Sequence, residues 1–124
     1  MPVTWSIEPA KRLVTIRYED PYTPAEWRDA FLAAIHDAWY EPGFGFLIDR
    51  RFAPEPTPEF ARAVADFVTG RLENTRVAIV ASTTAGFGMG RLQEALNAMA
   101  GLTSRAFTSV DSAIAWLQEE QHDT

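Results

Sequence analysis

The chain has 124 residues, of which 47% are hydrophobic and 23% charged, and its formal net charge is −6. These values are typical of an ordinary globular protein, and we expect a single domain over residues 1–124. The negative charge argues against nucleic acid and anionic membranes as partners. Because the chain has no cysteine, disulfide bonds, thiolate catalysis and sulfur-ligated zinc are excluded.

The start of the chain shows no basic segment followed by an apolar run, so we expect no signal peptide. No apolar run reaches the roughly 18 residues that suggest a membrane span. Together with the lack of cysteine, these features predict a cytoplasmic protein.

Two short runs of β-prone residues, 3–7 and 13–18, open the chain. The segment between them contains Pro9, and apolar and polar residues alternate in the second run. This pattern predicts an antiparallel hairpin.

The first helix is expected to begin after Thr23. Thr23 and Glu26 fit a capping box, and Pro24 stands where a missing N–H costs nothing. Large apolar residues then recur at four-residue spacing, at Trp27, Phe31, Ile35 and Trp39. This stripe predicts a helix that runs up to the stop signal at Pro42-Gly43.

Further strands and helices alternate after this point. Apolar runs at 44–48 and 77–81 predict buried strands, and a last short strand is expected at 106–108. Thr57 and Pro58 predict the start of a second helix, and Ser109 or Asp111 would cap a final one. The third helix is expected over 88–99, with Leu92, Leu96 and Met99 facing the core and Gly101 as its stop.

The order of these elements predicts an α/β fold. We expect a mixed β-sheet of four to five strands, with an N-terminal antiparallel hairpin followed by βα units, packed with about four helices. Strands 44–48 and 77–81 should lie side by side, so that the turns leaving them meet at one edge. Open α/β sheets bind ligands at that edge.

Three charged residues, Asp49, Arg50 and Arg51, follow the first of these strands. A carboxylate there can act in catalysis, but it can equally accept backbone N–H bonds in the following turn. No second carboxylate lies nearby in the sequence to share acid–base work. The structural interpretation of Asp49 is therefore favoured, and both arginines should lie along the ligand-binding edge.

A loop with Gly86, Gly88 and Gly90 is predicted to open the third helix, with Arg91 in its first turn. A helix start attracts anions, so a cation there suggests a carboxylate partner or a bound anion. The glycine spacing fits neither a P-loop nor a dinucleotide fingerprint. Two interpretations stay open: a tight turn with Arg91 paired to a surface acid, or a site for an anion or acidic peptide.

Other reactive residues lack partners in the sequence. His36 has Leu32 and Tyr40 at four-residue spacing, so a metal ligand set is not expected. Ser82 and its neighbours do not form a nucleophile elbow. We therefore expect no catalysis, no metal and no cofactor.

Seven segments follow one another along the chain: VTWSIE, RLVTIRYED, TPAEW, FGFLIDRR, RVAIVAS, GMGRLQEAL and DSAIAWL. Their pattern and order resemble the STAS/SEC14-type, SpoIIAA-like family, which is related to anti-sigma-factor antagonists. The resemblance covers nearly the whole chain and implies a small cytoplasmic module without catalysis. Relatives in the wider STAS group bind proteins and are switched by phosphorylation in the loop after the third strand. That loop here reads RRFAPEPTP, where Thr57 is already explained as a helix cap, so no phosphosite is assigned.

We therefore expect a non-enzymatic binding or regulatory domain that recognises a protein partner, a second copy of the chain being one option. The contact surface would combine Asp49, Arg50, Arg51 and the segment 86–91. The alternative is a carrier that holds a small anionic or apolar molecule, or a lipid, in a pocket between helix and sheet. The SEC14 side of the resemblance motivates that alternative.

Overall fold

The computed structural model describes the chain except for residues 1, 21, 55, 73–74 and 120–124. Its described residues form one five-stranded sheet in the order β1-β2-β3-β4-β5. The strands are β1 (Val3–Glu8), β2 (Leu13–Glu19), β3 (Gly45–Phe52), β4 (Arg76–Val80) and β5 (Thr103–Phe107). β1 and β2 are antiparallel and the other neighbours are parallel, which confirms the predicted fold class and the pairing of β3 with β4.

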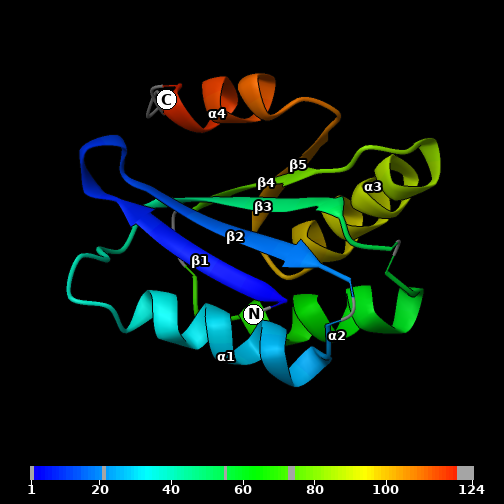
Figure 1. Ribbon diagram of the computed structural model, residues 1–124, viewed down its shortest axis with the longest axis horizontal. Coiled ribbons are helices and arrows are strands. Elements are labelled where there is room, and N and C mark those ends of the chain that lie inside the picture. Colours follow the sequence, from blue (N-terminus) through cyan, green and yellow to red (C-terminus); the bar gives the residue numbers. More distant parts are fainter. Residues whose placement is uncertain (1, 21, 55, 73–74, 120–124) are drawn as a thin grey trace.

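Four helices are described: α1 (Pro24–Ile35), α2 (Pro58–Val68), α3 (Thr84–Met99) and α4 (Val110–Gln118), besides a 3-10 turn at Pro9–Lys11. α1, α2 and α3 each connect two neighbouring parallel strands. Because such crossovers are right-handed, all three helices lie on one face of the sheet, and α4 lies alone on the other (Figure 1). None of the described helices has the length and hydrophobicity needed to cross a lipid bilayer.

Each face of the sheet has its own core. Side chains of a strand point alternately to the two faces, so Phe46 joins the core under α1, α2 and α3, whereas Leu47 joins the core under α4. Aromatic rings dominate the first core: Trp27 stacks on Phe31 at a centroid distance of 5.8 Å and meets Phe67 of α2 edge-on at 5.3 Å. These rings join α1 to α2.

The predicted starts of α1, α2 and α4 are confirmed. Thr23 and Glu26 form the capping box of α1, the hydroxyl of Thr57 accepts the backbone N–H of Phe60, and Ser109 caps α4. Each cap satisfies a backbone donor that the first turn of a helix leaves free.

The predicted end of α1 is wrong. The helix ends at Ile35, and Trp39, which was expected to continue its apolar stripe, is 69% exposed. The Oδ1 atom of Asp37 accepts the backbone N–H of Trp39 at 2.8 Å. This local bond competes with the helical pattern, because aspartate favours turns over helix interiors.

The prediction for α3 is wrong in its start and in its buried face. The helix begins at Thr84 rather than at residue 88, and its buried residues are Gly90, Gln93 and Asn97, whereas Met99 is exposed. Two strands also extend beyond their predicted bounds: β3 continues to Phe52, and β5 begins at Thr103. Residues 50–52, expected in the loop that follows the strand, therefore belong to the strand itself.

We predict that Trp27→Ala lowers the free energy of unfolding by about 3–5 kcal/mol, because Trp27 is 5% exposed and loses three ring contacts. The matched variant Trp39→Ala should change it by less than about 0.5 kcal/mol, since Trp39 lies at the surface. Urea unfolding followed by circular dichroism measures both. Equal losses would contradict the placement of Trp39 outside the core.

Candidate functional site

The carboxyl end of β3 carries Asp49, Arg50 and Arg51, as predicted, but their side chains lie on different faces of the sheet. Arg50 lies on the face covered by α1, α2 and α3, with its guanidinium over the ring of Tyr18 at 4.7 Å. Asp49 and Arg51 lie on the face that carries α4, as the alternation of the strand requires. The three charged residues therefore lie at one edge of the sheet, as predicted, but they do not form one surface, because Arg50 lies on the opposite face from Asp49 and Arg51.

Asp49 and Arg51 form a bidentate ion pair. The Nε and Nη2 atoms of Arg51 each donate to the Asp49 carboxylate at 2.9 Å, and the backbone N–H of Arg51 donates to the same group at 3.1 Å. Burial alone would raise the pKa of Asp49, but the hydrogen bonds and charge of Arg51, with the charge of Arg17, hold it below its usual value. This geometry agrees with the structural interpretation of Asp49.

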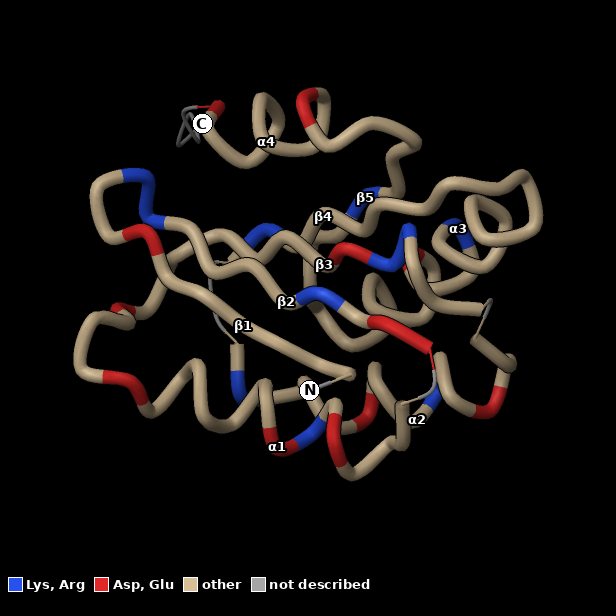
Figure 2. Tube along the Cα trace, viewed as in Figure 1, with Lys and Arg blue, Asp and Glu red and all other residues tan. Residues whose placement is uncertain are grey.

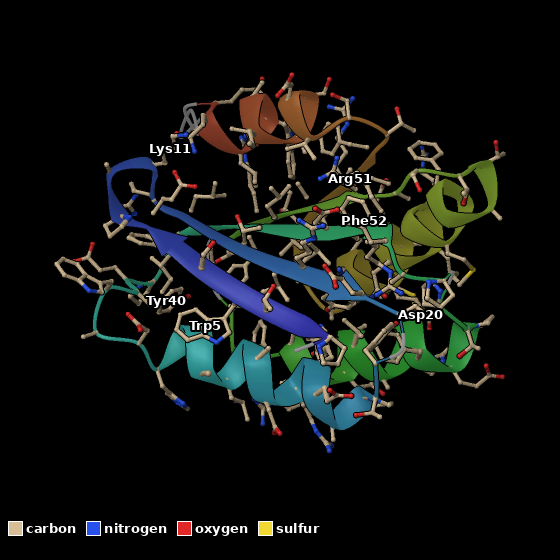
Figure 3. The ribbon with its side chains drawn as sticks, in the orientation of Figure 1. Trp5, Lys11, Asp20, Tyr40, Arg51 and Phe52 are labelled. Carbon is tan, nitrogen blue, oxygen red and sulfur yellow. The ribbon has the colours of Figure 1, made fainter. Side chains whose placement is uncertain are left out.

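Phe52 extends this charged surface. It is 48% exposed and lies near two guanidinium groups, Arg17 at 4.1 Å and Arg51 at 5.0 Å from its ring centroid. Figure 3 shows Arg51 and Phe52 close together where β3 ends, and Figure 2 shows acidic and basic residues interspersed at the ends of β2 and β3. We call Arg17, Asp49, Arg51 and Phe52 the charged edge.

The glycine segment is helical, which corrects the prediction of a loop. Gly86, Gly88 and Gly90 all lie within α3, and the hydroxyl of Thr83 accepts the Gly86 N–H at 2.9 Å. Arg91 lies in the second turn, so the argument that a cation is misplaced at the helix start does not apply. Its Nε atom lies 3.5 Å from the carboxylate of Glu94, so Arg91 is paired with an acid as one of the two interpretations expected, but that acid is partly buried and also accepts the backbone N–H of Ala106.

Gly90 allows α3 to approach β5 closely. A Cβ atom at this position would lie 2.9 Å from the Cβ of Ala106, which cannot move aside because it is bonded to the strand backbone. At Gly88 an added Cβ would meet nothing within 4 Å. Gly90 thus serves helix–sheet packing.

A cavity of about 60 Å³ lies between the sheet and helices α1, α2 and α3. Its walls are mainly apolar, with aromatic rings from α1, β3 and α2 and aliphatic side chains from α2 and β4. Gly86 and Gly90 line it from α3, and Arg50 lines it from β3. Ile48 also lines it and is only partly buried, although β3 is the central strand of the sheet. The helices therefore leave part of the sheet uncovered.

Arg50 is held beside the cavity by neutral groups. Its Nη2 atom donates to the hydroxyl of Tyr22 at 2.7 Å and to the carbonyl oxygen of Pro54 at 3.0 Å. Burial raises the pKa of Tyr18 well above its usual value, against a smaller opposing effect of the Arg50 charge. The phenol beneath the guanidinium therefore stays protonated at neutral pH and does not neutralise it.

The polar side of α3 was missed by the sequence analysis. The Nε2 atom of Gln93 donates to the carbonyl oxygen of Ala61 in α2 at 3.0 Å and to Asn97 at 2.8 Å, and Asn97 donates to Ser104 at 3.2 Å. Gln93 and Asn97 both line the cavity. The spacing of positions 86, 90, 93 and 97 was the available signal, since it places small and amide residues on one helical face.

The structure thus brings Arg50, Gly86 and Gly90 together around one cavity and pairs Asp49 with Arg51 on the opposite face. Gly88 and Arg91 lie away from both places: neither lines the cavity, and both are exposed. His36 is exposed at the end of α1, and the residues that the structure describes contain no group of three acidic or histidine side chains suited to a metal ion.

Comparisons with protein-family models, with curated proteins and with solved structures each give no match to this chain.

We predict opposite effects for two glycine substitutions in α3. Gly90→Ala should lower the free energy of unfolding by about 1–2 kcal/mol, because its Cβ overlaps Ala106. Gly88→Ala should raise it by about 0.5–1 kcal/mol, because alanine favours the helix and has room. Denaturant unfolding measures both. If Gly90→Ala were as stable as Gly88→Ala, α3 would lie farther from β5 than described.

We predict that Asp49→Asn lowers the free energy of unfolding at pH 7 by about 1–3 kcal/mol, because Arg51 loses its charged acceptor. The pKa of Asp49 is lower in the folded chain than in the unfolded chain, where it is about 3.9. The Asp49 charge therefore contributes fully to the free energy of unfolding above that pH, and the contribution is lost as the pH falls through the folded-state pKa. The difference between the wild type and Asp49→Asn should therefore shrink below about pH 4, as urea unfolding across pH would show.

The control for this experiment is Arg91→Gln, which breaks the ion pair of the exposed Arg91 with Glu94 and leaves the hydrogen bond of Glu94 to Ala106 in place. Exposed pairs contribute little, so the change should stay below about 1 kcal/mol. A stability difference for Asp49→Asn that does not vary with pH would contradict the role of the Asp49 charge.

Proposed function

We propose that this protein is a non-enzymatic binding domain that holds a small, mainly apolar molecule between its sheet and helices α1, α2 and α3. The observation that carries the proposal is the cavity of about 60 Å³ beside the partly uncovered Ile48. Protein interiors are normally close-packed, with few voids larger than a water molecule. A void lined by apolar walls and a few polar groups is the usual form of a ligand site.

The volume limits the ligand. Each water-sized group needs roughly 10–15 Å³ by this kind of measure, so the cavity admits about four to six such groups. An engineered apolar cavity of about 150 Å³ binds benzene. We therefore favour a short aliphatic segment over a long lipid chain, which narrows the carrier hypothesis drawn from the sequence.

The proposal also keeps what the sequence resemblance implies: a STAS-like, SpoIIAA-like module in the cytoplasm, without catalysis. Asp49 supports the last point. Both of its carboxylate oxygens accept hydrogen bonds from Arg51, and its pKa is lowered. A group held in this way is a poor general base, because catalysis at neutral pH favours a pKa near the working pH.

Recognition of a protein partner, a second copy of the chain included, is the second candidate function. The observation that favours it is the charged edge, where Phe52 is 48% exposed near Arg17 and Arg51. An exposed ring at the surface suits a protein partner, because the ring supplies apolar contact, while Arg17 and Arg51 are already paired with Glu19 and Asp49.

We predict that 1-pentanol shifts the amide NMR signals of residues around the cavity, and that Ile48→Phe abolishes these shifts without lowering the melting temperature. The larger ring fills space that is empty in the wild type. The matched variant Phe52→Ser changes the charged edge, where Phe52 contacts Arg17 and Arg51 and does not line the cavity, and should bind 1-pentanol like the wild type.

No response of the wild type to 1-pentanol, or the same response in Ile48→Phe, would contradict the proposal. If the wild type instead forms a dimer in sedimentation experiments that Phe52→Ser dissociates, the second candidate is favoured.

A further inference from the structure

Arg50 differs from the other arginines that the structure describes as partly buried. Arg51 pairs with Asp49, and Arg76 lies 3.8 Å from a carboxylate oxygen of Glu119. Within the described residues, Arg50 forms no ion pair, and its contacts are a hydroxyl, a carbonyl oxygen and aromatic rings. A partly buried cation is normally matched by an anion, because its loss of hydration is otherwise uncompensated.

Arg50 also keeps donors free. A guanidinium has five N–H groups, and both hydrogen bonds that Arg50 forms within the described part of the chain come from Nη2. Nη1 and Nε therefore have no acceptor in the described part of the chain. The same residue lines the cavity, next to Ile48 two positions earlier on the same face of β3. One end of the cavity wall thus offers a cation with unused donors, and the rest is mainly apolar.

We infer that the cavity ligand is a short aliphatic carboxylate, with its anionic group on the guanidinium of Arg50 and its chain against Ile48 and the helices. This inference rests on the proposed function and names its ligand class. Arg50 is the one charged residue among the described residues of the cavity wall, which suits a single negative charge. The volume suits an aliphatic chain of about four to six carbon atoms.

Aromatic contacts fix the cation in place for this role. The guanidinium lies over Tyr18 at 4.7 Å and near Phe60 of α2 at 5.8 Å, and Tyr22 holds Nη2. A positioned guanidinium loses little side-chain freedom when a carboxylate binds, and charge-assisted hydrogen bonds are the strong ones. Burial raises the pKa of Tyr18, so its phenol stays protonated and does not compete with the ligand as an anion.

The test compares three probes by NMR titration at neutral pH and fixed salt: pentanoate, 1-pentanol and acetate. Pentanoate and 1-pentanol share the chain, and pentanoate and acetate share the charge. We expect pentanoate to bind about tenfold more tightly than 1-pentanol, with shifts at cavity residues, and acetate to bind more weakly than either. The wild-type comparison stands even where a variant fails to fold.

Two substitutions locate the charge. Arg50→Met keeps the length and apolar contacts of the side chain but removes its charge, so pentanoate affinity should fall about tenfold while 1-pentanol affinity is unchanged. Arg91→Met removes an identical charge from the exposed face of α3 and should leave both affinities as in the wild type.

Equal affinity for pentanoate and 1-pentanol in the wild type would overturn the carboxylate assignment and leave the proposed function standing. The same holds if Arg50→Met retains the full preference for pentanoate. Absence of binding by all three probes would overturn the proposed function itself, and this inference with it.

Discussion

The mismatch between the width of a helix and the spacing of strands governs this fold. Neighbouring strands lie about 4.8 Å apart, whereas packed helices need about 8–10 Å between their axes. Three right-handed crossovers place three helices on the same face of the four parallel strands. These strands are too narrow for three helices to pack side by side on them. α1 packs on β1 and β2, α3 packs on β4 and β5, and α2 packs mainly on α3. The antiparallel strand β1 supplies the additional surface that α1 needs.

The cavity follows from this arrangement. α3 comes close to the sheet because Gly90 lets it touch Ala106, whereas α2 turns Phe60, Val64 and Phe67 toward the core beside its buried Val68. Phe60 and Phe67 meet Trp27 edge-on. Rigid rings do not fill an irregular space completely, so part of it stays open. α2 is tied to α3 by a buried hydrogen bond, and its position over the sheet is therefore fixed by contacts at its side rather than beneath it.

Local signals in the sequence were sufficient for much of the fold and insufficient for the site. The Thr23 capping box and the alternation in β2 act within a few residues, and both predicted the structure correctly. The early end of α1 depends on one side-chain bond at Asp37, and the helical state of the glycine segment depends on a contact with β5. The contact with β5 is a tertiary contact that overrides intrinsic helix propensity, whereas the Asp37 bond is local and competes with the helix. A pocket between helix and sheet entered the sequence analysis only through the family resemblance, and its lining could not be predicted, because six separate elements bound the cavity.

The period of the β-strand explains why the two candidate functions lie on opposite faces. Arg50 and Arg51 are adjacent in the chain, yet alternation sends one guanidinium to the cavity and the other to the charged edge. Their partners then determine what each can do. Arg51 has a carboxylate from its own strand, so its charge is already compensated and it contributes mainly to the stability of the edge. Arg50 rests on neutral rings and a hydroxyl, so it keeps its full charge for a group that the described chain does not supply. Of the two adjacent cations, Arg50 is therefore the one suited to bind a ligand.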